Sequence, residues 1–152
     1  MKLPPGLLSV HFQASFKRGT IIRFLMTDPD DPHVESRHKF ALVIGIDPES
    51  PESFLLLTTS KIDKYEVMRR RLPEGFHEFS VEDYSWVAKP TLLDMRKVRG
   101  YSKDELVQKM NDGCLTFECV LSEDDMRAID VKLKASRTIE LKTLRKIVAG
   151  IS

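Results

Sequence analysis

Residues 40–46 read Phe-Ala-Leu-Val-Ile-Gly-Ile, the longest fully apolar run of the chain. Its length and continuous apolar character predict a strand that is buried on both faces. The run is far too short for a membrane-spanning helix, so we expect no membrane partner. The first ten residues hold one lysine and no sustained apolar stretch, which is not the pattern of a secretory signal. Both observations favour a soluble protein with a cytoplasmic location.

The segments around this run predict more strands. Residues 20–24 (TIIRF) follow Arg18-Gly19 and are rich in β-branched side chains, which favours a strand. Three later segments have a similar pattern: 54–60 (FLLLTTS), 85–88 (SWVA) and 114–120 (CLTFECV). Aspartates and prolines predict turns in two places between them, residues 28–32 and 47–51.

Helix signals follow in the second half of the chain. Ser102 and Glu105 have the spacing of a capping box, and Gly113 provides a C-terminal stop. A second helix is predicted to begin at Ser122, with apolar residues on one face (Met126, Ile129 and Leu133). A third amphipathic helix is predicted from the apolar positions of the tail (Leu141, Leu144, Ile147 and Val148).

This order of elements predicts a protein that is mainly β with helices. Strands come first and helices later, which differs from the strand–helix alternation of a parallel sheet. We therefore expect a small, barrel-like antiparallel sheet with helices packed to one side. The length of 152 residues favours a single domain, residues 1–152. Within it, residues 1–14 form an N-terminal extension and residues 136–152 hold an extra C-terminal helix.

The composition excludes several classes of protein. Lys and Arg number 24 against 23 Asp and Glu, so bulk charge alone does not attract nucleic acid. Charge is nevertheless sorted into blocks: residues 1–24 hold no acid, 28–52 are acidic and 61–71 are basic. Two cysteines are too few for a disulfide scaffold, and we expect both to be packing residues. The histidines lack metal-ligand spacing, and no cofactor motif is present, so we expect neither a metal nor a cofactor.

Two polar clusters are candidate sites. Thr58, Thr59 and Ser60 end a predicted strand, and Arg37-His38-Lys39 begin the one before it. Antiparallel pairing brings the start of one strand near the end of the next, so cations and hydroxyls could share one edge of the sheet. The alternative is ordinary strand-end capping by the hydroxyls.

The second cluster is the basic run Arg69-Arg70-Arg71. Arginine can hold phosphates through bidentate, charge-assisted hydrogen bonds. The alternatives are a solvated loop or contact with an acidic partner. Among the basic and hydroxyl residues, we assign RNA binding to Arg18, Thr58, Lys61, Arg69, Arg70 and Arg71.

Taken together, these segments resemble the MazF/PemK family of toxin endoribonucleases, which are small SH3-like barrels of toxin–antitoxin systems. The family has a first strand with Arg-Gly, a strand with Arg-Pro-Ala, a strand that closes in Thr-Thr or Thr-Ser, and a turn into a C-terminal helix. The matching segments are residues 18–22 (RGTII), 39–44 (KFALVI), 57–60 (LTTS), 89–94 (KPTLLD) and 119–126 (CVLSEDDM). The resemblance covers roughly residues 15–135.

The resemblance implies a catalytic set, and the chain departs from it in places. Family members cleave RNA with the arginine of the Arg-Pro-Ala strand and the threonine of the next strand. The threonine corresponds to Thr59, or to Thr58 if the register slips by one. Lys39 stands at the arginine position and keeps the charge without the planar fork. Arg37 is a substitute cation, and Ser60 completes the catalytic set. Ala88 stands where some members have an acid.

The resemblance also implies a function and partners. We expect a toxin-like endoribonuclease that cleaves single-stranded RNA without a metal, as a homodimer neutralised by an antitoxin protein. Attack of the ribose 2′-hydroxyl on the adjacent phosphate gives a 2′,3′-cyclic phosphate, and His38 is a candidate proton carrier. One alternative is a catalytically degenerate module of the same fold that binds RNA or a protein partner. Another is an unrelated accessory domain that shares only the strand order.

Overall fold

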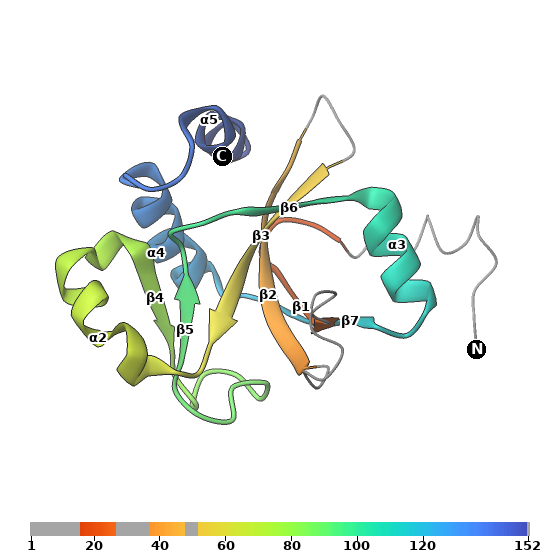
Figure 1. The fold of residues 1–152 in the computed structure, drawn as a ribbon, viewed down its shortest axis with the longest axis horizontal. Coiled ribbons are helices and arrows are strands. Elements are labelled where there is room, and N and C mark those ends of the chain that lie inside the picture. Colours follow the sequence, from red (N-terminus) through yellow and green to blue (C-terminus); the bar gives the residue numbers. More distant parts are fainter. Residues whose placement is uncertain (1–15, 27–36, 48–51, 152) are drawn as a thin grey trace.

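The computed structural model describes residues 16–26, 37–47 and 52–151, except the side chains of Met26 and Arg37 (Figure 1). The strands are β1 Thr20–Met26, β2 Arg37–Ile46, β3 Glu52–Thr59, β4 Phe76–Phe79, β5 Thr91–Asp94, β6 Arg99–Ser102 and β7 Leu115–Val120. The helices are α2 Ile62–Arg71, α3 Lys103–Asn111, α4 Glu123–Lys134 and α5 Leu141–Ala149, with a 3-10 turn, η1, at Pro73–Gly75.

The strands form one seven-stranded antiparallel sheet in the order β4-β5-β3-β2-β1-β7, and β6 also pairs with β3. The prediction of a mainly β protein with an antiparallel sheet and helices is therefore confirmed, but α2 lies between β3 and β4 and not after the strands. β4 and β7 lie at the two ends of this order, and within the described residues no pairing joins them. The sheet is not closed there, so a closed barrel is not established.

β3 is paired on both edges, and the two ladders end at different residues. On one edge its ladder with β2 ends at the pair Ala41 and Leu57. On the opposite edge its first half pairs with β6, and further along Thr58 pairs with Leu93 and Thr59 with Leu92 of β5. Beyond Leu57 the last residues of β3 and the first residues of β2 are unpaired with each other and diverge (Figure 1).

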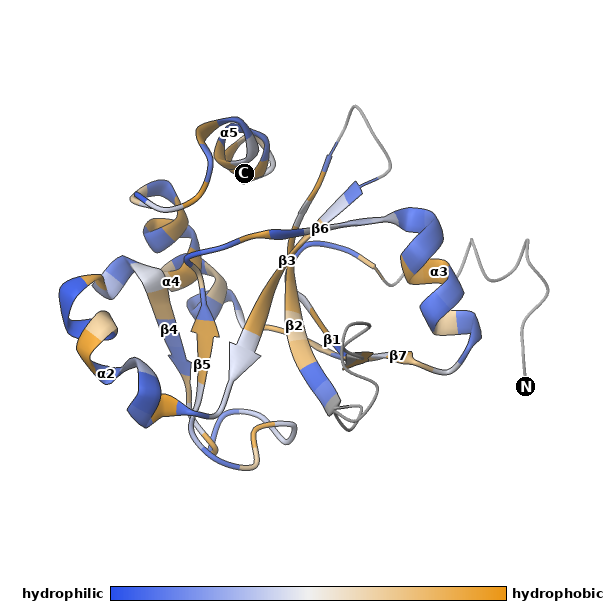
Figure 2. Cartoon of the chain, in the orientation of Figure 1, coloured by the Kyte–Doolittle hydropathy of each residue, from blue (hydrophilic) through white to orange (hydrophobic). Residues whose placement is uncertain are grey.

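Both faces of the central strands are buried. Leu42 and Ile44 of β2 belong to one core cluster, and the alternate residues Ala41 and Val43 belong to a second cluster. All four side chains have no exposed surface, which confirms burial on both faces for the centre of the run, whereas Ile46 at its end is 49% exposed. Figure 2 shows the same concentration of hydrophobic residues on the central strands.

The helices cover both faces, which corrects the expectation that they pack on one side. α4 and α5 contribute Ile129, Leu133 and Ile147 to the first cluster, whereas α3 contributes Leu106 to the second. The physical reason is that a strand apolar on both faces needs cover on both. Among the described helices, none combines the length and apolarity needed to cross a bilayer.

The predicted helix signals act as expected. The Ser102 hydroxyl accepts the backbone N–H of Glu105 at 3.2 Å, and the Ser122 hydroxyl accepts that of Asp125 at 3.2 Å. Each bond satisfies one free N–H of a first turn, as N-caps do. Gly113 follows the C-cap of α3, Asp112, and has a φ of +75°, a left-handed conformation that glycine adopts at no steric cost.

One strand prediction is wrong. Residues 85–88 lie in a loop that joins β4 to β5, residues 80–90, and not in a strand. Within this loop the backbone N–H of Asp83 bonds to the carbonyl of Ser80, and that of Val87 bonds to the carbonyl of Tyr84. These short-range turn bonds replace the cross-strand bonds that the apolar residues of the segment suggested.

Two ion pairs fasten the C-terminal helices to the sheet. Arg18 bonds to the carboxylate of Asp130 on α4 and donates to the carbonyl of Ile44 at 3.1 Å. The Lys146 ammonium of α5 lies 2.5 Å from the buried carboxylate of Asp47. The expected turn at residues 47–51 lies outside the described residues except for Asp47, and the one at 28–32 lies wholly outside them.

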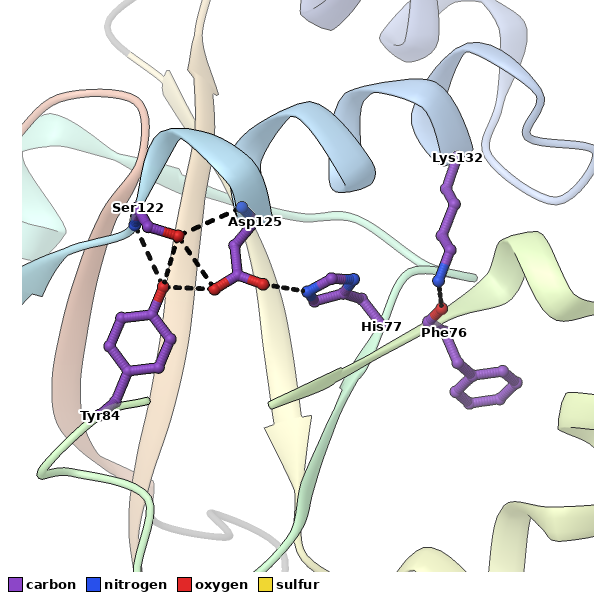
Figure 3. Close-up of polar contacts among 6 residues, drawn as sticks. All are labelled: Phe76, His77, Tyr84, Ser122, Asp125 and Lys132. Atoms are coloured by element: carbon purple, nitrogen blue, oxygen red, sulfur yellow. Dashed lines mark hydrogen bonds and ion pairs between the residues drawn. The ribbon is translucent and has the colours of Figure 1, made fainter. Parts of the chain in front are cut away.

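A hydrogen-bonded network joins α4 to β4 and to the loop 80–90 (Figure 3). The Tyr84 hydroxyl donates to the carboxylate of Asp125 and accepts the backbone N–H of Ser122 at 3.1 Å. The other carboxylate oxygen of Asp125 lies 2.9 Å from Nε2 of His77. On the next turns of the helix, Lys132 donates to the carbonyl of Phe76 at 2.6 Å.

Burial sets the protonation of this network. The side chain of His77 is nearly enclosed, and burial lowers its pKa, although the hydrogen bond with Asp125 acts in the opposite direction. Burial alone would raise the pKa of Asp125, but hydrogen bonds from Tyr84, His77 and Ser122 together outweigh it and lower that pKa. The network therefore favours a neutral imidazole beside a charged carboxylate.

The lowered pKa of His77 predicts that the free energy of unfolding falls as the pH drops through about 6.5. Over that range the unfolded chain binds a proton that the folded protein resists, so acid favours unfolding. Urea unfolding from about pH 8 to about pH 5 measures the slope, and carboxylates stay ionised over most of that range.

His77→Gln is the matched variant, because glutamine can still donate to Asp125 and does not titrate. We expect this variant to show a shallower pH slope than the wild type, while the other three histidines are common to both proteins. Equal slopes in the two proteins would contradict the assignment.

Candidate nucleic-acid interface

A cavity of about 470 Å³ opens where β3 leaves β2. In Figure 1 the end of β3, the start of α2 and the loop between β4 and β5 lie at the same end of the molecule. The cavity is lined by His38, Lys39, Phe40, Leu57, Thr58, Thr59, Ser60, Lys61, Lys64, Tyr65, Trp86, Ala88, Lys89, Thr91, Asp94 and Arg99.

The strand divergence explains how consecutive residues of β2 reach one cavity. Side-chain alternation predicts that His38 faces away from Lys39, yet both line the cavity together with Phe40. The β2–β3 ladder begins only at Ala41, so residues 38–40 border the open space. Within it, the Thr58 hydroxyl donates to the carbonyl of Phe40 at 2.9 Å and bridges the two strands.

The hydroxyl groups of the cavity differ in their bonding. Thr58 is buried, and its hydroxyl hydrogen is directed to the carbonyl of Phe40. Thr59 is half-buried, and its hydroxyl accepts the backbone N–H of Lys61 at 3.2 Å, an exposed bond that uses a lone pair. Ser60 is exposed. Thr59 and Ser60 are therefore better placed than Thr58 to donate a hydrogen bond to a ligand.

Positive charge dominates the lining. Five lysine or arginine residues contribute to it and one carboxylate, that of Asp94. The cations are Lys39, Lys61, Lys64, Lys89 and Arg99, which come from β2, the β3–α2 junction, α2, the loop 80–90 and β6. Low-dielectric walls lined by one sign of charge attract ligands of the opposite sign. The cavity thus suits an anion such as a phosphodiester.

The single carboxylate is itself neutralised. Asp94 accepts two hydrogen bonds from the Arg96 guanidinium, at 3.0 and 2.9 Å. The guanidinium also lies over the rings of Tyr65, 5.2 Å from the centroid, and Phe76, at 5.0 Å. The hydrogen bonds to Asp94 raise the pKa of Arg96, so the guanidinium stays charged. Arg96 therefore fixes α2 against β4 and β5 on one side of the cavity.

Aromatic rings form another part of the lining. Phe40, Tyr65 and Trp86 contribute to it from β2, α2 and the loop 80–90. The rings of Phe40 and Trp86 are 5.0 Å apart and tilted, and Phe79 packs edge-to-face on Trp86 at 5.3 Å. Aromatic faces beside cations are the usual components of sites for single-stranded nucleic acids.

The structure brings half of the sequence-predicted site residues to this cavity: Lys39, Thr58, Thr59, Ser60 and Lys61. It places four others elsewhere. Arg18 bonds to Asp130 and to a backbone carbonyl between the sheet and α4. Arg69, Arg70 and Arg71 lie in the last turn of α2 and not in a loop. The side chain of Arg37 lies outside the described part of the structure.

Helical geometry explains why the arginine run is not one site. Successive residues of a helix point about 100° apart, so the three side chains diverge. Arg69 pairs with Glu78 of β4 at 3.0 Å, and Arg70 pairs with Glu66 one turn earlier at 2.9 Å. Both pairs are solvent-exposed and contribute little to stability.

Sequence reasoning missed most of the residues that the other elements supply: Lys64, Tyr65, Trp86, Lys89, Asp94 and Arg99. Lys61 and Lys64 have the i, i+3 spacing of a helix face, which was a usable signal. For Trp86, the turn-forming residues before it indicated a loop. In the part of the chain that the structure describes, no three His, Cys, Asp or Glu side chains gather as a metal site.

Comparison of the chain with models of known protein families finds no match. A search of curated proteins likewise finds no significant relative.

Proposed function

We propose that this protein binds single-stranded RNA in the cavity between β2 and β3 and cleaves it there without a metal. The observation that carries the proposal is the convergence of Lys39 with Thr59 and Ser60 in a cavity with a surplus of cations. Cations neutralise phosphates, and hydroxyls donate to their nonbridging oxygens. Phe40, Tyr65 and Trp86 add surfaces on which bases could stack.

The proposed reaction is an internal transfer of the phosphoryl group. The ribose 2′-oxygen forms a bond to phosphorus, the bond to the 5′-oxygen breaks, and a 2′,3′-cyclic phosphate remains. A base takes the 2′-hydroxyl proton, and the departing 5′-oxygen gains one. His38 lines the cavity, and an imidazole side chain can accept or donate a proton, so it suits either transfer.

In the proposed reaction, Lys39 and Thr59 stabilise the negative charge of the transition state. The phosphorane carries more negative charge than the ground-state diester, so groups aimed at its oxygens stabilise the transition state. Lys39 supplies the cation, and Thr59 and Ser60 supply hydroxyl donors. We assign Thr58 a structural part, because its hydroxyl hydrogen bonds to the carbonyl of Phe40.

The proposal includes the family to which the protein belongs. A divergent MazF/PemK-like toxin, with an SH3-like barrel, a homodimeric groove and a neutralising antitoxin protein, is consistent with the antiparallel sheet and with the position of the Lys39 and Thr59 cluster. The binding-only alternative is favoured by one observation: a lysine occupies the central cationic position. Lysine is a point charge without the bidentate fork of arginine, which suits phosphate attraction better than fixed orientation.

If the cleavage proposal is correct, Lys39→Ala and Thr59→Ala each lower the cleavage rate by about 100-fold, the usual cost of removing one oxyanion-stabilising group. Purified protein is incubated with end-labelled single-stranded RNA in EDTA, and the products are resolved on a denaturing gel. The expected fragments end in a 2′,3′-cyclic phosphate and a 5′-hydroxyl. Arg127→Ala is the matched control, because Arg127 is an exposed cation on α4 outside the cavity lining and has no assigned role in RNA binding.

Two results would decide against cleavage. If the wild-type protein binds RNA and produces no fragments over varied sequences, the binding-only function stands. If fragments persist equally in Lys39→Ala and Thr59→Ala, the activity does not come from this cavity.

RNA affinity should fall with salt, because the lining cations displace counterions from the phosphates. Lys64→Ala and Lys89→Ala should each weaken binding and reduce the slope of log K against log salt by about 0.7. Fluorescence anisotropy of a labelled single-stranded RNA over a salt series measures both quantities. Arg127→Ala should leave the slope unchanged. An equal change in all three variants would indicate attraction by diffuse surface charge and not binding at a defined site.

A further inference from the structure

We propose that Trp86 contacts a nucleobase in the cavity and that Tyr84 positions it there through its hydrogen bonds to α4. The inference rests on the proposed binding of RNA. It identifies the residue that contacts the base and the hydrogen bonds that hold this residue in place.

Trp86 lies at the boundary between the cavity and the hydrophobic core. It lines the cavity, is half-buried, and packs on one core cluster together with Phe40 and Tyr84. The Lys89 and Arg99 cations line the same cavity. A ligand with a phosphate at the cations therefore has an aromatic surface within the same 470 Å³ space. Each base of a single strand has a π face, and stacking on tryptophan is the sequence-tolerant way to bind it.

The backbone around Trp86 has little regular structure to hold it. The loop 80–90 has turn bonds but no strand pairing, so its position depends on side-chain anchors. Val87, next to Trp86, is buried in the first core cluster, and Tyr84 provides a polar anchor two residues before Trp86. The rings of Tyr84 and Trp86 pack with centroids 5.8 Å apart. Phe79 of β4 contacts both rings, edge-to-face, at 5.9 and 5.3 Å.

The Tyr84 hydroxyl makes the connection to α4 (Figure 3). It lies between the backbone N–H of Ser122, which it accepts at 3.1 Å, and the carboxylate of Asp125, to which it donates. Asp125 is three residues after the N-cap, the position from which an acid normally reaches back to the N-cap N–H. Here the tyrosine hydroxyl is inserted into that capping box.

This arrangement ties the loop to a rigid element. The first turn of α4 is fixed by the Ser122 cap, and Ile129 and Leu133 further along the helix are fully buried. Asp125 is also held by His77 of β4 at 2.9 Å. Loss of the Tyr84 hydroxyl would leave its ring contacts in place and release only the polar link between loop and helix.

Trp86 is the only tryptophan of the chain, so the fluorescence of the unmodified protein reports on this position alone. The protein is titrated with a single-stranded RNA of about ten nucleotides, within the span of typical single-strand sites. A parallel titration uses inorganic polyphosphate, which has phosphates and no bases. Anisotropy of a labelled RNA, and its displacement by polyphosphate, measure binding independently of the tryptophan.

We expect RNA to quench the Trp86 emission, and polyphosphate to displace RNA while leaving that emission nearly unchanged. Trp86→Leu should weaken RNA binding by about tenfold and leave polyphosphate binding unaffected. Trp86→Phe, which keeps an aromatic ring, should recover part of the loss. RNA binding with no quenching and no effect of Trp86→Leu would overturn the inference and leave the proposed function standing. Absence of RNA binding to the wild-type protein would overturn both.

Tyr84→Phe tests the positioning. We expect it to shift the emission maximum of Trp86 in the free protein and to weaken RNA binding several-fold, with polyphosphate binding preserved. Tyr101→Phe is the matched control, since Tyr101 packs on Phe24 in the second core cluster and does not line the cavity. If Tyr84→Phe leaves both the emission and the RNA affinity at wild-type values, Tyr84 does not position Trp86.

Discussion

The candidate site depends on one constraint: the ladder between β2 and β3 stops at Ala41 and Leu57, while β3 continues to Thr59 by pairing with β5 on its opposite edge. Residues 38–40 of β2 therefore have no ladder partner on β3 and border the cavity. A continued ladder would close this space with backbone hydrogen bonds. The Thr58 hydroxyl bridges it through the carbonyl of Phe40, in the way a side chain substitutes for a missing ladder bond.

The parts of the fold that sequence predicted are those with strong local signals. The run through residues 40–46 is apolar on both faces, and Ser102 and Ser122 each precede an amphipathic segment as N-caps. The parts that it missed lack such signals. α2 has no buried residue, so no apolar stripe marks it, and β4, β5 and β6 have four residues each. Short strands are stabilised by their neighbours, and their pairing is a tertiary property.

The residues of the candidate site also divide into those that local sequence signals could predict and those that they could not. Hydroxyls at the end of β3 and cations at the start of β2 could be placed together, because antiparallel neighbours always bring such ends close. Trp86, Lys89 and Arg99 come from a loop and a strand whose positions depend on long-range anchors. The arginine run of residues 69–71 does not line the cavity for a local reason: the helix directs the three side chains away from one another, and Glu78 and Glu66 pair with two of them.

The aromatic residues around the cavity are fixed by neighbouring residues, whereas the lysines that line it have flexible side chains. On one side Arg96 is fixed by Asp94 and by two aromatic rings, and on the other Tyr84 is fixed by α4. The lysines between them have long stems with little intrinsic order. A rigid aromatic frame with adaptable cations can accept the variable backbone of a single strand, since phosphates need nearby positive charge more than a fixed hydrogen-bond geometry.

Cleavage needs a more precise geometry than binding, because only groups that are already oriented stabilise the transition state. In this cavity that requirement falls on Thr59, whose hydroxyl is held by the backbone N–H of Lys61. The difference between a binding module and a nuclease therefore rests on how firmly the end of β3 is held after it leaves β2.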